Sequence, residues 1–234
     1  MSDFHFKHFS IFQEQADLKV GTDSMLLGAF AEFENPKRIL DIGTGTGVLS
    51  LMLAQKYPES EITALEINPF AFDLAKQNFE NNLLGKKCSL QLIALQDFQT
   101  PVKFDGIISN PPYFEDSLKN NKEGKSLARH TDSLSYEELI SKSKSLLSEN
   151  GTAWFILPFL SSNRFLEIIE ANNLNIKRQI EIEGKPGQKV RVIFELGKQE
   201  TKTIIETFVI RDEENNYTDE YVDLTKEFHN KSVR

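Results

Sequence analysis

The sequence predicts an α/β fold in which a mostly parallel sheet carries helices on both faces. Apolar strand-like runs alternate with helix-like runs over residues 38–157, and the first of these strands ends in a glycine-rich turn. Parallel strands need crossover helices, so this alternation indicates a sheet that is covered on both sides. With 234 residues, 39% of them hydrophobic, the chain is long enough for one full core. We therefore expect a single domain over residues 1–234.

The chain begins with an aromatic segment and a helix. Aromatic residues alternate over residues 4–9, which fits a short strand or hairpin, and such alternation is more typical of a core than of an RNA-stacking surface. Thr22 and Asp23 then belong to a turn and N-cap that open a helix. We expect residues 1–37 to cover the ligand site of a core that occupies residues 38–234.

The remaining elements follow from periodicity and capping signals. Ser135 and Glu138 form the pattern of a capping box, and Ser161 is expected to cap a helix that ends near residue 171. Three β-type runs near the C-terminus, separated by Gly and Lys turns, suggest an antiparallel edge closed by a hairpin. Strands are expected at 38–43, 61–67, 89–95, 104–109, 152–157, 175–183, 190–196 and 203–210. Helices are expected at about 47–57, 69–83 and 136–148.

Composition excludes several classes of protein. The single cysteine, Cys88, cannot form an internal disulfide, and the sequence shows no signal peptide and no apolar run near the ~20 residues that span a bilayer. We therefore expect a cytoplasmic protein that does not enter a membrane. The net charge of −8 argues against wholesale nucleic-acid binding, because phosphate contacts need Lys and Arg. No obligate protein partner is evident.

The turn after the first core strand has the pattern of a nucleotide-binding loop. Gly43, Gly45 and Gly47 stand at alternate positions, where they let the backbone turn sharply and approach a ligand closely. The helix that begins near Gly47 points its free N–H groups into the same space. A dinucleotide-binding loop has the spacing G-x-G-x-x-G instead. Asp41 would repel a pyrophosphate but suits the ammonium of a methionine moiety. S-adenosylmethionine therefore fits this loop, which includes Thr44, better than NAD.

The next two strands supply further candidate cofactor contacts. Glu66 ends the second strand, 19 residues after Gly47, where a carboxylate can reach ribose hydroxyls. Asn68, two residues later, is a further candidate, as are Thr22, Asp23 and Asn110. At the end of the third strand, we expect Asp97 to accept the adenine amine and Phe98 to flank the ring. Alternatively, Asp97 caps a short helix or turn.

The fourth strand ends in Asn110-Pro111-Pro112-Tyr113, a pattern suited to methylating the nitrogen of a planar amino group. Such a nitrogen, in adenine or in a glutamine amide, shares its lone pair with a π system and is a poor nucleophile. The Asn110 oxygen and the Pro111 carbonyl can each accept one N–H, which favours a nitrogen moving toward tetrahedral geometry. The prolines stiffen the turn, and Tyr113 can stack on the flat target. Alternatively, the tetrapeptide is only a turn that closes a strand.

A polar, lysine-rich loop is expected at 113–134, directly after this tetrapeptide. A long loop next to a site is usually a lid or a substrate contact, and a basic rim lets an acidic protein bind RNA locally. A disordered insertion and solvated lysines without a partner are the alternatives. The candidate substrate contacts are Phe114, Lys119, Lys125, Arg129, His130, Lys189 and Arg191.

Together these motifs resemble the class I S-adenosylmethionine-dependent methyltransferases, whose Rossmann-like, mostly parallel sheet has seven strands and a C-terminal antiparallel hairpin. Within that class, several stretches resemble the tRNA1(Val) adenine N6-methyltransferases over nearly the whole chain. These enzymes methylate the adenine beside the anticodon. The stretches are F-x-F-K-x-F-x-I-x-Q, K-V-G-T-D-S-x-L-L-G-A-F, D-I-G-T-G-T-G, N-P-P-Y-F, S-L-A-R-H-T and residues 217–228.

The resemblance implies roles for individual residues. Asn110 and Pro111 hold the adenine amine, Tyr113 stacks on the ring, and the loop with Arg129 and His130 contacts tRNA. The residues that it assigns to the cofactor are Asp41, Gly43, Gly45, Glu66 and Asp97. The chain departs from residues common in the family at Ser24, Lys125 and His229.

The expected reaction is a direct SN2 methyl transfer to the exocyclic N6 of an adenine in the anticodon loop, at position 37 of a valine tRNA. No metal is expected, because the histidines have no ligand spacing. A protein glutamine N5-methyltransferase acting on release factors is the main alternative, although such enzymes carry a helical domain ahead of the glycine loop. A DNA adenine methyltransferase would need a larger target-recognition region. A non-catalytic scaffold that binds S-adenosylmethionine or RNA is the remaining alternative.

Overall fold

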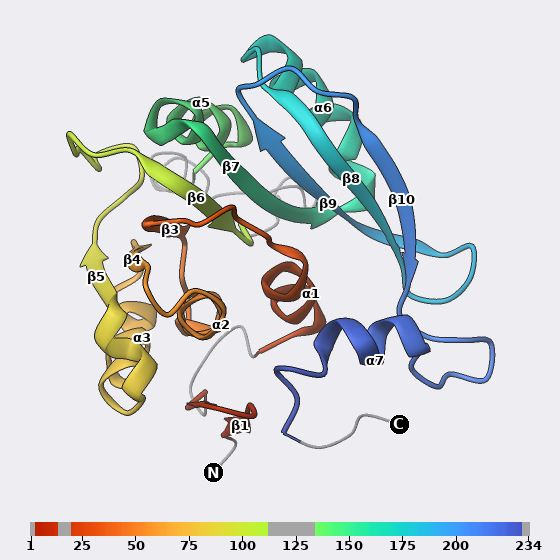
Figure 1. Cartoon of the computed structure of the whole chain (residues 1–234), viewed down its shortest axis with the longest axis horizontal. Helices are drawn as coiled ribbons and strands as arrows, with labels where there is room; N and C mark the ends of the chain where they lie inside the picture. The colour runs from red at the N-terminus through yellow and green to blue at the C-terminus, as the bar shows by residue number, and fades with distance from the viewer. Residues whose placement is uncertain (1–2, 14–19, 112–133, 231–234) are drawn as a thin grey trace, which may run out of the picture.

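The computed structural model describes residues 3–13, 20–111 and 134–230 and places the glycine-rich strand inside an eight-stranded sheet. The strands of this sheet are β3 (Arg38–Ile42), β4 (Glu61–Glu66), β5 (Cys88–Leu92), β6 (Phe104–Ser109), β7 (Leu147–Pro158), β8 (Asn175–Glu183), β9 (Lys189–Gly197) and β10 (Ile204–Val209). Their order is β10-β8-β9-β7-β6-β3-β4-β5 (Figure 1). A separate small sheet pairs β1 (Phe4–His5) with β2 (Ser10–Ile11).

The large sheet is mostly parallel, with an antiparallel region toward one edge. Neighbours from β5 to β7 pair in parallel, whereas β9 pairs antiparallel with both β7 and β8. The predicted α/β class and C-terminal hairpin are therefore confirmed. The resemblance implies seven strands, but the sheet has eight, because the run expected at 203–210 forms β10 at its edge. β10 is parallel to β8, since residues 198–203 cross past the start of β8 instead of turning back beside β9.

Helices cover both faces of the sheet (Figure 1). They are α1 (Thr22–Phe30), α2 (Val48–Lys56), α3 (Pro69–Glu80), α5 (Tyr136–Leu146), α6 (Ser162–Ala171) and α7 (Asp219–Thr225), with 3₁₀ segments η1 (Leu83–Lys87) and η2 (Phe159–Ser161). The face with α1, α2, α3 and α7 has a core that includes Leu26 and Trp154. The face with α5 and α6 has a core that includes Phe155 and Phe165. Within the described residues, no helix has the length and apolar character needed to cross a membrane.

The helix starts follow local sequence signals. The Glu138 N–H donates to Ser135 Oγ at 3.1 Å, and the Ser135 N–H donates to the Glu138 carboxylate at 2.9 Å, so the predicted capping box opens α5. α6 begins directly after Ser161 as predicted, although this serine makes no side-chain capping bond. Asn68 caps α3 by accepting from two backbone N–H groups. The capping side chains supply partners for N–H groups that have none inside a helix.

The N-terminal aromatic segment forms the predicted hairpin and packs into the core. Phe6 and Phe9 are both buried, and their rings stack with centroids 4.2 Å apart. Asn78 of α3, also buried, accepts from the Phe12 N–H at 2.8 Å and donates to the Thr46 carbonyl at 2.8 Å. Asn78 therefore ties the N-terminal segment to the glycine loop.

Lys56 of α2 holds the C-terminal end of α1. Its amine donates to the carbonyls of Gly28, Ala29 and Ala31 at 3.4, 2.9 and 2.6 Å. The last carbonyls of a helix have no partner inside that helix, so Lys56 acts as a cap supplied by a neighbouring element. Burial lowers the pKa of Lys56 to about 8. This contact fixes α1, the helix whose first turn reaches the candidate site.

Candidate active site

The carboxyl ends of β3, β4 and β6 meet at one edge of the sheet. Asp41 of β3 lies opposite Ala64 of β4 and Ile108 of β6. Glu66 and Asn110 each follow two residues later, on either side of the glycine loop. The strand order reverses here, because β4 and β5 continue to one side of β3 while β6 and β7 lie to the other. Open α/β sheets bind their ligands at such a reversal point.

The glycine loop adopts a backbone conformation that favours glycine. The φ angle is +71° at Gly43, +57° at Gly45 and +81° at Gly47, all in the left-handed region. A Cβ at Gly47 would lie 2.5 Å from a ring atom of Phe79, whereas among the described residues, chain neighbours aside, no heavy atom lies within 4 Å of the Cβ position at Gly43 or Gly45. Within the described part of the chain, the loop is therefore packed at Gly47 and open at Gly43 and Gly45.

Asp41 supports the glycine loop from inside the protein. Its side chain is fully buried, and one carboxylate oxygen accepts from the hydroxyls of Thr44 at 2.6 Å and Ser50 at 2.7 Å. The other oxygen has no hydrogen-bond donor in the part of the chain that the structure describes. Burial raises the pKa of Asp41 to about 6; the two hydroxyls oppose this rise, and the charge of Glu66 adds to it. A buried oxygen without a donor is costly, which fits an acceptor for a cationic group.

Glu66 links the glycine loop to the end of β4. One carboxylate oxygen accepts from the Gly45 N–H at 2.8 Å, and the other accepts from the N–H groups of Ile67 and Asn68, both at 2.9 Å. A carboxylate offers about four lone-pair positions, so Glu66 keeps capacity for a ligand hydroxyl. Asn68 uses its own side chain to cap α3, and its direct contact with a cofactor stays a prediction.

Two exposed apolar side chains lie beside Glu66 and are not among the site residues predicted from the sequence. Ile67, directly after β4, and Phe70, in the first turn of α3, are 51% and 47% exposed. Binding sites are lined mostly by apolar surface, with a few polar groups that fix orientation. The sequence feature that could have identified Ile67 is its position directly after Glu66, the acid that ends β4. We regard Ile67 as a candidate for contact with a flat ring.

Phe98 is buried, and its predicted contact with the cofactor stays a prediction. The Phe98 ring is only 5% exposed and packs in the core, with its centroid 6.4 Å from that of Phe104. A tight turn directs it inward, since the Phe98 N–H donates to the carbonyls of Ala94 and Leu95 at 3.1 and 3.2 Å. Asp97, in the same turn, is exposed at this edge and stays a candidate.

Asn110 directly follows β6 and is half-buried. Its side-chain amide donates to the hydroxyl of Ser24 at 3.3 Å, and among the described residues no donor contacts its Oδ1. Ser109 Oγ donates to the Ile42 carbonyl at 2.8 Å and so joins the ends of β6 and β3. Pro111 is buried. The structure thus presents one amide oxygen beside the glycine loop.

Two predicted substrate contacts are ion-paired within the protein. Arg191 donates to the Asp23 carboxylate at 2.9 Å, and Lys189 pairs with Glu181 at 2.5 Å. Thr22 begins α1 and is exposed. The ion pairs give Asp23, Lys189 and Arg191 partners within the fold, and their contacts with cofactor or RNA stay predictions.

The predicted residues that lie outside the described part of the chain are Pro112, Tyr113, Phe114, Lys119, Lys125, Arg129 and His130.

Cys88 is unsuited to nucleophilic chemistry. Burial raises the pKa of its thiol to about 12, and the charge of Asp41 adds to this rise. The thiol is therefore protonated at neutral pH, whereas the thiolate is the reactive form. Over residues 3–13, 20–111 and 134–230, no three side chains among His, Cys, Asp and Glu gather as metal ligands.

Comparison with solved structures shows the same fold in methyltransferases. A predicted O-methyltransferase from Agrobacterium tumefaciens matches with a TM-score of 0.68 at 17% identity, over 88% of this chain and 96% of that chain. A ribosomal protein L11 methylase from Lactobacillus delbrueckii subsp. bulgaricus matches with a TM-score of 0.57 at 20% identity, over 84% of this chain and all of that chain. The family model "Methyltransferase small domain" matches residues 8–171. The fold and the glycine-loop site define an S-adenosylmethionine-dependent methyltransferase of class I.

Curated relatives give the particular family. The tRNA1(Val) (adenine(37)-N6)-methyltransferase of Bacteroides fragilis is 40% identical over 97% of each chain, and that of Pseudoalteromonas translucida is 38% identical over 98% of this chain and 99% of the relative. This chain belongs to the family of tRNA1(Val) (adenine(37)-N6)-methyltransferases. The family predicted from the motifs is therefore confirmed.

Proposed function

We propose that this protein transfers a methyl group from S-adenosylmethionine to the exocyclic N6 of adenine 37 in the anticodon loop of a valine tRNA. The observation that carries the proposal is the position of Asn110 Oδ1, an acceptor without a donor among the described residues, across the glycine loop from Glu66. Relatives at 38% and 40% identity are named for this reaction.

The residues around the glycine loop fit the cofactor. When bound, S-adenosylmethionine supplies an electrophilic methyl group on a sulfonium. The open space at Gly43 and Gly45 admits a ligand close to the backbone. Glu66 would accept from ribose hydroxyls, Asp41 would meet the methionine ammonium with its unpartnered oxygen, and Asp97 would accept from the adenine amine.

Asn110 and Pro111 hold the target amine. The Asn110 oxygen and the Pro111 carbonyl each accept one N–H, and this arrangement stabilises the positive charge that develops on the nitrogen. An SN2 transfer needs that nitrogen at a near-attack distance, ~3 to 3.5 Å from the methyl carbon. The adenine must leave its stack, and unstacking is less costly in an anticodon loop than in a duplex. The new N–CH3 bond would form as the S–CH3 bond breaks, which leaves S-adenosylhomocysteine and a cationic N6. No strong base is required, because an N–H on the cationic nitrogen is acidic and its proton can pass to water.

Asp41→Asn is expected to stabilise the cofactor-free protein at pH 8 and to weaken cofactor binding. The pKa of Asp41 rises from 3.8 to about 6 on folding. Its stabilising contribution is therefore full below pH 3.8 and is lost as the pH rises through 6. At pH 8 the buried charge costs roughly 1–3 kcal/mol. The gain in melting temperature of the variant over the wild type should grow from pH 5 to pH 8.

Asp73→Asn, at an exposed position on α3, is the control for loss of one negative charge. It should leave both the melting temperature and the affinity for S-adenosylmethionine near wild-type values at each pH. A melting difference for Asp41→Asn that does not change with pH would show that ionisation of Asp41 is not the cause.

We also propose that the protein acts as a single domain in the cytoplasm, without a metal or an obligate protein partner. The free Cys88 suits a reducing compartment. A methylation assay with the purified chain alone, in the presence of EDTA, tests the absence of both a metal and a partner.

The reaction is tested by incubating the protein with unmodified tRNA pools and, in a parallel reaction, with a release factor, each with S-adenosylmethionine carrying a labelled methyl group. Nucleoside mass spectrometry of the RNA is expected to show labelled N6-methyladenosine, and mass spectrometry of oligonucleotides from the isolated tRNAs should confine it to position 37 of a valine tRNA. Label on a release-factor glutamine instead of RNA would establish the glutamine reaction. No label in either, with intact cofactor binding, would support a non-catalytic scaffold.

A further inference from the structure

The first turn of α1 contacts two strand ends that are distant in sequence. The Asn110 amide, 86 residues from Ser24, donates to the Ser24 hydroxyl at 3.3 Å. Arg191, 168 residues from Asp23, donates to the Asp23 carboxylate at 2.9 Å. Ser24 and Asp23 are neighbours, so the turn that meets Asn110 is also tied to β9. At its other end, α1 is held by Lys56.

The Asn110 side chain can rotate, and only one orientation suits the proposed chemistry. The target amine brings N–H donors, so the amide must present its oxygen and turn its nitrogen away. In that orientation the half-buried nitrogen carries hydrogens that need an acceptor, and a donor left without a partner costs free energy. The Ser24 hydroxyl supplies that acceptor. Hydrogen bonds in a chain also polarise one another, so the bond to Ser24 makes the Asn110 oxygen a better acceptor.

We propose that Ser24 is a positioning residue for methyl transfer: it holds the Asn110 amide with its oxygen toward the target amine. The ion pair between Asp23 and Arg191 keeps the turn that carries Ser24 in place. The role of Ser24 rests on the proposed transfer at Asn110 and adds to it a residue that acts through Asn110. Arg191 then contributes to the reaction through Asp23 and α1.

Kinetics of Ser24→Ala test the role of this serine. The variant is expected to lower kcat for tRNA methylation by about three- to tenfold, with KM for tRNA and Kd for S-adenosylmethionine within twofold of wild type. Ser24→Thr keeps a hydroxyl and should recover most of kcat. Ser162→Ala, at the first residue of α6 on the opposite face of the sheet, is the matched control for loss of a helix-start serine and should leave kcat unchanged.

A double-mutant cycle separates positioning from a general structural role. In an Asn110→Ala background, Ser24→Ala should cause no further loss of residual turnover, because the group it positions is gone. An equal loss in both backgrounds, or a wild-type kcat for Ser24→Ala, overturns the proposal. Failure of the proposed function is distinguishable, since the wild-type protein would then leave tRNA adenine unmethylated.

Discussion

Asn110→Ala is expected to reduce kcat for tRNA methylation by about 10²–10³-fold, the loss typical of removing one preorganised group that stabilises transition-state charge. The Asn110 oxygen lies at the end of β6, and the variant removes it without disturbing the glycine loop, Asp41 or Glu66. The affinity for S-adenosylmethionine, measured by calorimetry, should therefore stay within about twofold. Single-turnover kinetics with saturating cofactor and tRNA would isolate the chemical step.

Asn110→Asp is the matched companion of this variant. The aspartate side chain has the same length and keeps an acceptor oxygen for the target amine. Its second oxygen replaces the amide nitrogen and cannot donate to the Ser24 hydroxyl. We expect its turnover to fall between those of wild type and Asn110→Ala. A near wild-type rate for Asn110→Ala would refute the role of Asn110 in holding the amine.

Gly45→Ala is expected to weaken binding of S-adenosylmethionine by about one to two orders of magnitude while the protein stays folded. In the described part of the chain, no atom other than those of Gly45 and its chain neighbours lies within 4 Å of the Cβ position at Gly45, so the added methyl group enters the space assigned to the ligand. Overpacking of a close contact costs about 1–3 kcal/mol, and each 1.4 kcal/mol is a tenfold change in affinity. Calorimetric titration with S-adenosylmethionine measures the change directly.

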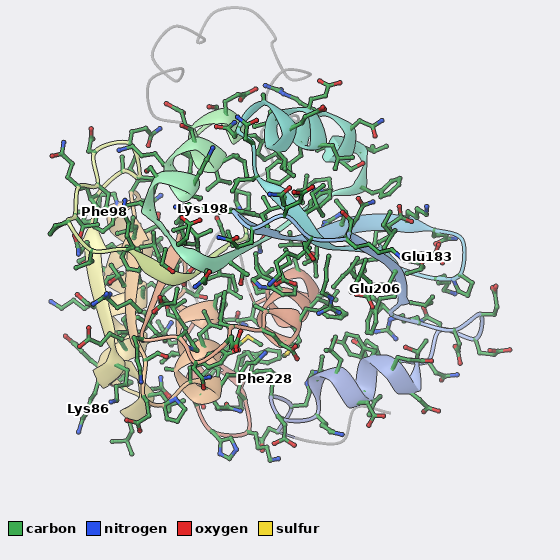
Figure 2. The ribbon with its side chains drawn as sticks, turned by 45° about the horizontal axis from the view of Figure 1, so that its top comes forward. Lys86, Phe98, Glu183, Lys198, Glu206 and Phe228 are labelled. Atoms are coloured by element: carbon green, nitrogen blue, oxygen red, sulfur yellow. The ribbon has the colours of Figure 1, made fainter. Side chains whose placement is uncertain are left out.

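Gly187→Ala controls for the backbone strain of this substitution. Gly187, in the turn between β8 and β9, has φ +76° against +57° at Gly45, and apart from chain neighbours no described residue has an atom within 4 Å of either Cβ position. Both N–H groups donate to a glutamate carboxylate, at 2.7 Å to Glu183 and 2.8 Å to Glu66. Glu183, which accepts from the Gly187 N–H, lies on the opposite side of the molecule from Phe98, the neighbour of the candidate cofactor contact Asp97 (Figure 2). Both variants should lose similar melting temperature, and a similar loss of cofactor affinity in both would contradict the assigned cofactor position.

Several elements can be read from the sequence because local signals define them. The limits of β6 and β8 agree with the predicted runs at 104–109 and 175–183, since apolar or β-type residues there stop at turn-forming residues. The capping box at Ser135 fixes the start of α5, because its bonds join residues three positions apart. Asn110, Glu66 and the glycine loop are assigned to one edge because parallel strands with crossover helices bring their carboxyl ends together.

Other features depend on residues that meet only after folding. The burial of Phe98 follows from a turn at 94–98 that faces the core. The parallel pairing of β10 depends on which side of β8 the chain passes, and the β-type pattern of 203–210 is the same for either side. The exposure of Ile67 depends on what surrounds the end of β4.

The fold class, the family, the glycine loop and the Asn-Pro-Pro-Tyr strand end are all readable in the sequence, because periodicity, glycine spacing and proline are local properties that need no partner. How these parts are held depends on folding: Asp41 lies under the loop, Lys56 on the end of α1, and Ser24 against Asn110. Ser24 and Asn110 are 86 residues apart, and no local pattern encodes their contact. It exists because packing of α1 on the sheet places its first turn at the end of β6 and beside β9.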